Sequence, residues 1–131
     1  MSDGLRVPVR WQDLDALGHV SHVAYLRYFE EARDAWLRGH GIRRDQYVVG
    51  RCSVEYRGEI PPEVEAVRVR CAATRIGRSS LTTREEVVDD DGAVLAEAEF
   101  GLVLWDPRER RSRPIDDDER ASLALNMEAL G

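Results

Sequence analysis

The clearest pattern in the chain is a helical repeat of apolar residues between Ser21 and Arg38. Its apolar positions recur at intervals of three and four residues, and charged side chains follow the same spacing on another face. Serine is a common N-cap, and the glycines after Arg38 are common at helix ends. A helix of this length spans roughly 27 Å, about the width of a small domain, so it is expected at the centre of the fold. The apolar stripe consists of Tyr25, Tyr28, Phe29, Ala32, Ala35 and Trp36.

Alternation of apolar and polar residues predicts strands on both sides of this helix. One strand precedes it at residues 5–11, where Pro8 indicates a sheet edge or a bulge. Those that follow the helix are joined mainly by short connections, which predict antiparallel neighbours in chain order. A short helix with acidic residues in its first turn is expected near the C-terminus. The later strands are expected at about 47–59, 63–76, 79–88 and 93–105.

This order of elements predicts an α+β domain, in which one long central helix is wrapped by an antiparallel sheet of approximately five strands. The length and the 43% hydrophobic content fit one domain with a single core over residues 1–131. An open sheet leaves two edges and one face uncovered, so self-association is expected.

Composition narrows the classes of function. The net charge of -6 argues against binding to nucleic acid, and no run of eighteen apolar residues is present to cross a membrane. The N-terminal residues lack an apolar leader segment. Cys52 and Cys71 are expected to be reduced and packed as small apolar side chains, as in a cytoplasmic protein.

Ionisable residues gather just before the long helix, at Asp13, Asp15, His19 and His22. The first turn of a helix presents unpaired amide N–H groups and the positive end of its dipole, which suit a developing oxyanion. A carboxylate upstream can act as a nucleophile or a general base on a carbonyl held there. Asp13 is predicted instead to be a turn residue bonded to nearby amides. His19 can be either packed or functional, and a metal site of Asp15, His19 and His22 is a weaker alternative.

The segment DLDALGHVSHVAYLRYFEEAR resembles the hotdog-fold acyl-CoA thioesterases, in particular the 4-hydroxybenzoyl-CoA thioesterase-like group. That group carries Asp-x-Asp-x-x-Gly-His-Val-Asn-Asn-x-x-Tyr-x-x-Tyr-Phe-Glu at this place. Strand and turn spacing extend the resemblance over residues 5–120. Ser21 and His22 stand where the group often has Asn-Asn, and Leu17 stands where plant-type acyl-carrier thioesterases have asparagine. These departures bear on substrate preference and rate more than on reaction type.

The resemblance implies a hotdog fold and the hydrolysis of an acyl-CoA to a free carboxylic acid and CoA. It places the catalytic carboxylate at Asp15, as nucleophile or general base, and the backbone amide that polarises the thioester carbonyl at about His22. His19 is a further, open catalytic candidate. The site would lie at the interface of a homodimer or homotetramer, and no cofactor or metal is implied beyond the CoA of the substrate. Expected substrate contacts are Tyr25, Tyr28 and Phe29 at the acyl group and Arg75, Arg78, Ser79 and Ser80 at the CoA phosphates.

Two other functions stay open. A non-catalytic hotdog module that binds acyl-CoA or an acyl carrier would fit the missing asparagines at Leu17 and Ser21. A hotdog hydratase would carry aspartate and histidine five residues apart, with asparagine and proline between them. Asp15 and His19 are four residues apart with neither between them, so the hydratase is the weaker alternative.

Overall fold

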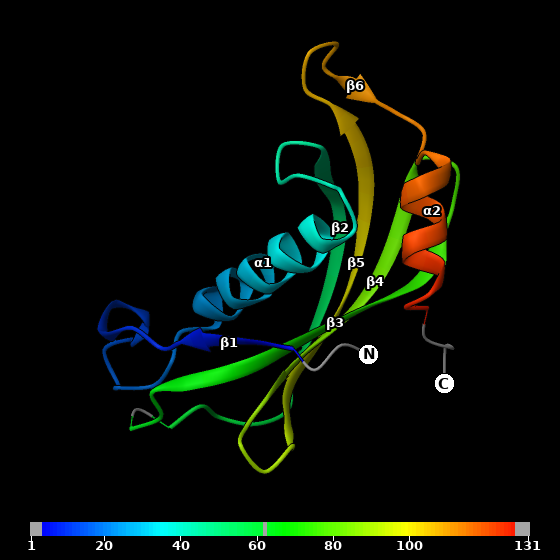
Figure 1. The fold of residues 1–131 in the computed structure, drawn as a ribbon. Coiled ribbons are helices and arrows are strands. Elements are labelled where there is room, and N and C mark those ends of the chain that lie inside the picture. Colours follow the sequence, from blue (N-terminus) through cyan, green and yellow to red (C-terminus); the bar gives the residue numbers. More distant parts are fainter. Residues whose placement is uncertain (1–3, 62, 128–131) are drawn as a thin grey trace.

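A curved antiparallel sheet and one long helix along its inner side make up most of the computed structural model, which describes residues 4–61 and 63–127 (Figure 1). The long helix is α1 (His22–Gly39), and a short helix α2 (Asp117–Ala124) packs against β3. The predicted α+β hotdog arrangement, with a helix wrapped by a sheet, is confirmed. The remaining elements are β1 (Leu5–Pro8), the 3-10 turn η1 (Trp11–Asp13), β2 (Tyr47–Tyr56), β3 (Ala66–Ile76), β4 (Ser80–Val88), β5 (Val94–Asp106) and β6 (Arg111–Ser112).

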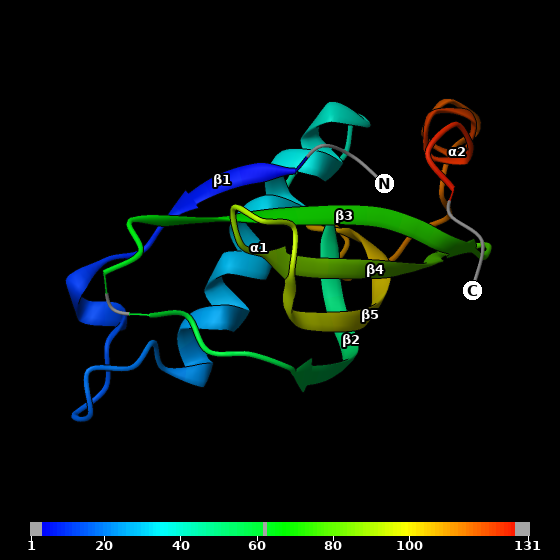
Figure 2. The same ribbon diagram turned by 90° about the horizontal axis from the view of Figure 1, so that it is seen from below.

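The main strands lie in the order β1-β3-β4-β5-β2, and each neighbouring pair is antiparallel. Tight turns join β3 to β4 and β4 to β5, as predicted. The expected position of β2 beside β3 is wrong, because β2 pairs with β5 at the opposite side of the sheet. The amides of Arg57 and Gly58 both bond to the carbonyl of Leu95, at 2.8 and 3.0 Å, so the chain leaves β2 beside β5. Figure 2 shows the connection running from there past the beginning of α1 to β3.

The first strand is shorter than predicted. β1 ends at Pro8 and lies at the edge of the sheet, where the proline was expected. The chain then turns through η1, in which the amide of Asp13 bonds to the carbonyl of Arg10 at 2.9 Å. Trp11 is consequently 86% exposed instead of continuing the strand into the core.

α1 begins and ends where the sequence predicts. The N-cap Ser21 accepts the amide of Val23 through Oγ at 3.3 Å, and Gly41 follows the helix with a φ of +83°. The helix packs on the sheet through rings such as Phe29 and Phe100, whose centroids are 5.8 Å apart. Its buried face differs in detail from the prediction, because Arg33 is buried whereas Trp36 is only half-buried.

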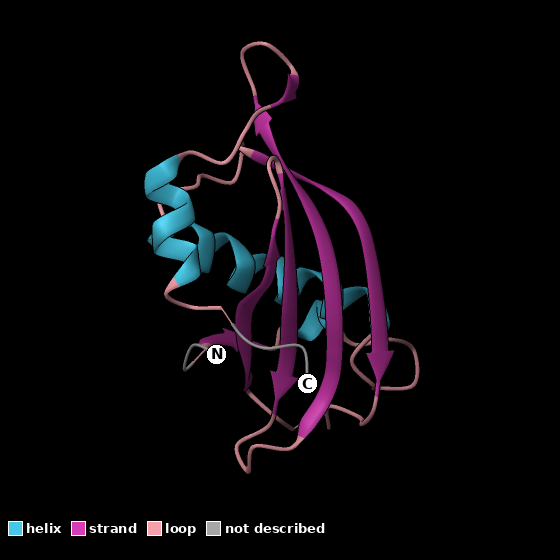
Figure 3. Ribbon diagram, turned by 90° about the vertical axis from the view of Figure 1, so that its right-hand side faces the viewer, coloured by secondary structure: helices cyan, strands magenta, loops and turns pink. Residues whose placement is uncertain are grey.

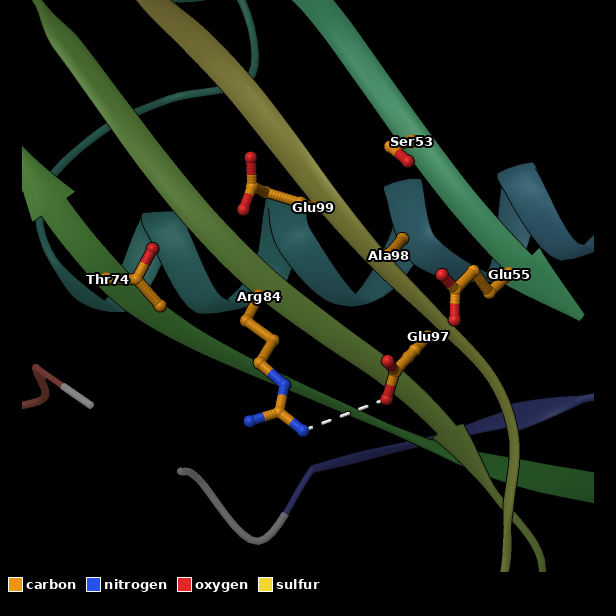
Figure 4. Close-up of a pocket in the computed structure, with 7 residues that line it drawn as sticks. All are labelled: Ser53, Glu55, Thr74, Arg84, Glu97, Ala98 and Glu99. Atoms are coloured by element: carbon orange, nitrogen blue, oxygen red, sulfur yellow. Dashed lines mark ion pairs between the residues drawn. The ribbon is translucent and has the colours of Figure 1, made fainter. Parts of the chain in front are cut away.

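The outer face of the sheet is charged and lies opposite α1. In Figure 3 the strands pass in front of α1, and Figure 4 shows Arg84, Glu97 and Glu99 on this outer side. These three residues line part of a hollow of about 370 Å³. Arg84 pairs there with Glu97 at 3.7 Å. Cys71 is packed, as predicted, whereas Cys52 is exposed on the edge strand β2.

Candidate active site

The side chain of Asp13 is an internal anchor of the loop that precedes α1. Its Oδ2 accepts the amide of Arg10 at 2.8 Å and the hydroxyl of Tyr28 at 2.7 Å, and its Oδ1 accepts the guanidinium of Arg27. Burial alone would raise the pKa of Asp13, but these three donors outweigh it and lower the pKa. The predicted bond from Asp13 to a nearby amide is present, and two side chains of α1 reinforce it.

Asp15 is exposed, and its backbone and one carboxylate oxygen are held within the loop. Its Oδ1 accepts the amides of Leu17 and His19 at 2.9 and 3.1 Å. Its own amide donates to the carbonyl of His19 at 2.7 Å, and Gly18 adopts a φ of +78° that closes the turn. Oδ2 makes no hydrogen bond within residues 4–61 and 63–127, so this oxygen is available to a bound molecule.

The backbone amide of His22 is the first of α1. Ser21 accepts the next two amides, Val23 through Oγ and Ala24 through its carbonyl at 2.9 Å. The amide of His22 has no acceptor in the part of the chain that the structure describes, so a donor points away from the start of the helix. Tyr56 donates its hydroxyl to the carbonyl of His22 at 3.3 Å and so joins the edge strand to this turn.

Four of the predicted site residues, Asp15, His19, His22 and Tyr25, line one open cleft of about 430 Å³. Tyr25 forms part of its wall, because its hydroxyl donates to the carbonyl of Gly58 at 3.3 Å. Burial raises the pKa of Tyr25, which keeps that hydroxyl protonated as a donor. The rest of the cleft is lined by Val20, Tyr56, Arg57, Gly58 and Glu59.

The end of β2 and the segment that follows it contribute cleft residues that the sequence did not identify. The ring of Tyr56 stands edge-on to Tyr25, with centroids 5.2 Å apart. Oε1 of Glu59 lies 2.9 Å from Nε2 of His19. No local spacing relates this segment to the loop before α1, and only the crossing from β2 to β3 brings them together.

Two predicted acyl-pocket residues do not line this cleft. Tyr28 and Phe29 are 0% exposed and belong to the core between α1 and the sheet. Their place beside Tyr25 is taken by Tyr56, which is 47% exposed at the end of β2. The expectation for Tyr28 and Phe29 is therefore wrong for the cleft of the single chain.

The predicted phosphate contacts lie at the turn between β3 and β4. The loop before α1 lies near the other end of β3, where Pro8 pairs with Ala66. The 11 residues of β3 span roughly 35 Å, so one chain does not bring these contacts to its own cleft. The guanidiniums of Arg75 and Arg78 form no ion pair with any residue that the structure describes. The four predicted contacts are Arg75, Arg78, Ser79 and Ser80.

Two other expectations concern metals and membranes. Among residues 4–61 and 63–127, no group of three or more His, Cys, Asp or Glu side chains is arranged to hold a metal ion. Asp15, His19 and His22 therefore share a cleft without forming the metal site considered from the sequence. No helix within the described ranges is long and apolar enough to span a membrane.

The fold agrees with a family comparison. The model of the Thioesterase-like superfamily matches residues 9–123, and the chain belongs to this superfamily. The enzyme class predicted from the segment around Asp15, a thioesterase, is thereby confirmed.

Individual relatives lie in the same class. The chain is 29% identical over 119 residues to the acyl-CoA thioester hydrolase YbgC of Escherichia coli, and the match covers 84% of this chain and 88% of YbgC. A thioesterase from Thermus thermophilus, solved as a complex with coenzyme A and Zn, is 31% identical, with a TM-score of 0.81 over 95% of this chain and 96% of that one. A predicted thioesterase from Bacillus stearothermophilus is 26% identical, with a TM-score of 0.85 over 97% of both chains.

Proposed function

We propose that the protein hydrolyses acyl-CoA thioesters to a free carboxylic acid and CoA, with Asp15 as the catalytic carboxylate. The observation that carries this proposal is the position of Asp15 and His22 in one cleft. Oδ2 of Asp15 and the backbone N–H of His22 have no partner among the residues that the structure describes. YbgC is named an acyl-CoA thioester hydrolase, and the Thermus thermophilus relative was solved with coenzyme A, which supports the substrate class.

The chemistry follows from the two unpaired groups. The amide of His22, at the positive end of α1, would donate to the thioester carbonyl and stabilise the negative charge that develops on its oxygen. The two amides on Oδ1 of Asp15 fix the carboxylate so that Oδ2 faces the bound substrate. Oδ2 would either attack the acyl carbon or remove a proton from a water molecule that does so. Tyr25 and Tyr56 would contact the acyl group.

The functional unit in this proposal is a homodimer, or a homotetramer built from such dimers. β2 is a sheet edge of 10 residues, and Val48, Val49 and Tyr56 on it are 38%, 46% and 47% exposed. Long apolar edges of this kind are rarely left uncovered. Near the cleft, Trp11 and Leu17 are 86% and 79% exposed, which adds apolar surface for a partner to cover.

A dimer would also complete the substrate site. If the β2 strands of two copies paired antiparallel, the β3–β4 turn of one copy would come to the side of the other copy's cleft. The CoA phosphates could then reach the guanidiniums of Arg75 and Arg78 and the hydroxyls of Ser79 and Ser80. The reaction needs no cofactor besides the CoA of the substrate. We place it in the cytoplasm, where an exposed thiol such as that of Cys52 persists.

The test is hydrolysis of a panel of acyl-CoA esters by the wild-type protein and by Asp15→Asn. The variant keeps the shape of the side chain, and we expect normal folding with a loss of kcat on the order of a hundred-fold or more. Asp45→Asn is the matched control, because Asp45 is an exposed loop carboxylate paired with Arg43 at 3.2 Å. Full activity of Asp15→Asn would overturn the mechanism, and tight binding of acyl-CoA without turnover by the wild type would favour the binding module.

A further inference from the structure

We propose that Glu59 is a positioning residue that orients His19, and that His19 protonates the CoA thiolate as it leaves. This inference rests on the proposed thioester hydrolysis. It starts from the ion pair between Nε2 of His19 and Oε1 of Glu59, 2.9 Å apart in the cleft that also holds Asp15.

An isolated ion pair with half-exposed side chains contributes little to stability, so the case depends on how the two residues are held. The side chains of His19 and Glu59 are 50% and 59% exposed. Both backbone groups of His19 bond to Asp15. The amide of His19 donates to Oδ1 of Asp15 at 3.1 Å, and the carbonyl of His19 accepts the Asp15 amide at 2.7 Å.

Glu59 is held just as firmly. The preceding residue, Gly58, donates its amide to the carbonyl of Leu95 at 3.0 Å and accepts the hydroxyl of Tyr25 at 3.3 Å. The following residue, Ile60, is only 1% exposed. Because its neighbours are anchored, the backbone of Glu59 is fixed within reach of His19, and only the side chains remain to be ordered.

This contact decides which ring nitrogen is available for chemistry. With Nε2 facing the Glu59 carboxylate at 2.9 Å, Nδ1 is the nitrogen left to carry or release a proton, and it makes no hydrogen bond with the residues that the structure describes. A carboxylate on one nitrogen of an imidazole fixes the orientation of the ring and stabilises the protonated form. His19 would therefore be held as a proton donor at the cleft.

Hydrolysis of a thioester has a step that needs such a donor. When the tetrahedral intermediate collapses, the carbon–sulfur bond breaks and its electron pair goes to sulfur. The proton on Nδ1 of His19 moves to that sulfur and gives the CoA thiol. Water supplies the hydroxyl of the acid, and the proton that Asp15 takes from this water returns to His19, so the cycle balances.

Other charged groups surround His19 in the cleft. The guanidinium of Arg57 is engaged by Glu55 and Glu97 at 2.9 and 2.8 Å. The groups that share the cleft with His19 are Asp15, His22, Tyr25, Tyr56, Arg57 and Glu59.

The test compares Glu59→Gln and His19→Gln with the wild type on the acyl-CoA that it hydrolyses best. We expect Glu59→Gln to lower kcat by about ten-fold with little change in KM, and His19→Gln to lower it by more. Glu99→Gln is the matched control, since Glu99 forms a similar exposed pair with Arg51 at 2.8 Å on the outer face of the sheet.

A change of leaving group separates this role from a structural one. An acyl thioester of 4-nitrothiophenol releases an acidic thiol that needs no proton, so Glu59→Gln and His19→Gln should approach wild-type kcat/KM on it, whereas Asp15→Asn should remain inactive. The inference is overturned if Glu59→Gln matches the wild type on acyl-CoA, or if its loss is the same on both esters. Absence of acyl-CoA hydrolysis by the wild type would instead overturn the proposed function.

Discussion

The hydroxyl of Tyr28 donates a hydrogen bond of 2.7 Å to Oδ2 of Asp13, and both side chains are removed from solvent. This bond joins the middle of α1 to the loop that carries Asp15. The loop is therefore anchored from inside the protein, while Asp15 itself faces the cleft.

Because the pKa of Asp13 is lowered in the folded protein, its carboxylate should contribute to acid resistance. That stability is present above the ordinary value of 3.8 and is lost as the pH falls through the lowered folded value. Asp13→Asn should cost about 3 kcal/mol at neutral pH and flatten the loss of stability in acid. Urea unfolding at a series of pH values measures both effects, and an unchanged acid slope would contradict this assignment.

Arg33 and Glu85 form a buried ion pair between α1 and β4, with Nε 3.0 Å from Oε2. The guanidinium also lies 3.9 Å from the centroid of Phe100. Burial raises the pKa of Glu85, although Arg33 and the hydroxyl of Thr83 oppose this. Glu85→Gln should lower the free energy of unfolding by about 3 kcal/mol, because it leaves a buried cation without its counter-charge.

The control for this pair is the double variant Arg33→Met/Glu85→Met, which removes both charges and keeps most of the volume. We expect it to be more stable than Glu85→Gln, because no unpaired charge remains. Thermal and urea unfolding of Arg33→Met, Glu85→Met and the double variant give the coupling. Additive losses would show that the pair is not coupled.

Ser21 caps α1 at the point where the free amide of His22 begins the helix. Ser21→Ala removes the acceptor of the Val23 amide and should cost about 1 kcal/mol, or roughly 4 °C in Tm. Ser21→Asp keeps an acceptor and should retain most of the stability. Calorimetry of the two variants tests the cap, and equal Tm values for Ala and Asp would exclude it.

The exposed edge strand predicts the effect of charge on assembly. Val48→Lys/Val49→Lys places two like charges on β2 and should shift the protein from dimer towards the 14.9 kDa monomer in sedimentation. If the CoA-binding side chains come from the second copy, the monomer should also show a raised KM for acyl-CoA. A wild-type protein that sediments as a monomer with full activity would contradict the dimer.

Local patterns predicted the helix and the inward face of β5, because a cap and a periodic stripe are read over neighbouring residues. They did not predict that β2 pairs with β5, since its edge position depends on where the nonlocal connection to β3 runs. The burial of Arg33 was equally hidden. Its counter-charge, Glu85, is 52 residues away, so the helical repeat alone gave no reason to expect a buried arginine.

The candidate site shows the same division. Asp15, His19, His22 and Tyr25 lie within one short segment, and the structure brings them into one cleft at the start of α1. The sequence did not indicate Tyr56 and Glu59 as cleft residues. They lie at the end of β2 and just after it, and only the tertiary fold brings them to the start of α1. The prediction for Arg75 and Arg78 depends on a second subunit, which a single chain cannot supply.

The most direct measurement is a crystal structure of the Asp15→Asn variant with an unreacted acyl-CoA. We expect the thioester carbonyl oxygen at about 3 Å from the backbone nitrogen of His22, with the acyl carbon facing the side chain at position 15. We also expect the CoA phosphates at Arg75 and Arg78 of the second subunit. A thioester bound away from both His22 and position 15 would contradict hydrolysis by Asp15 with the His22 amide at the carbonyl.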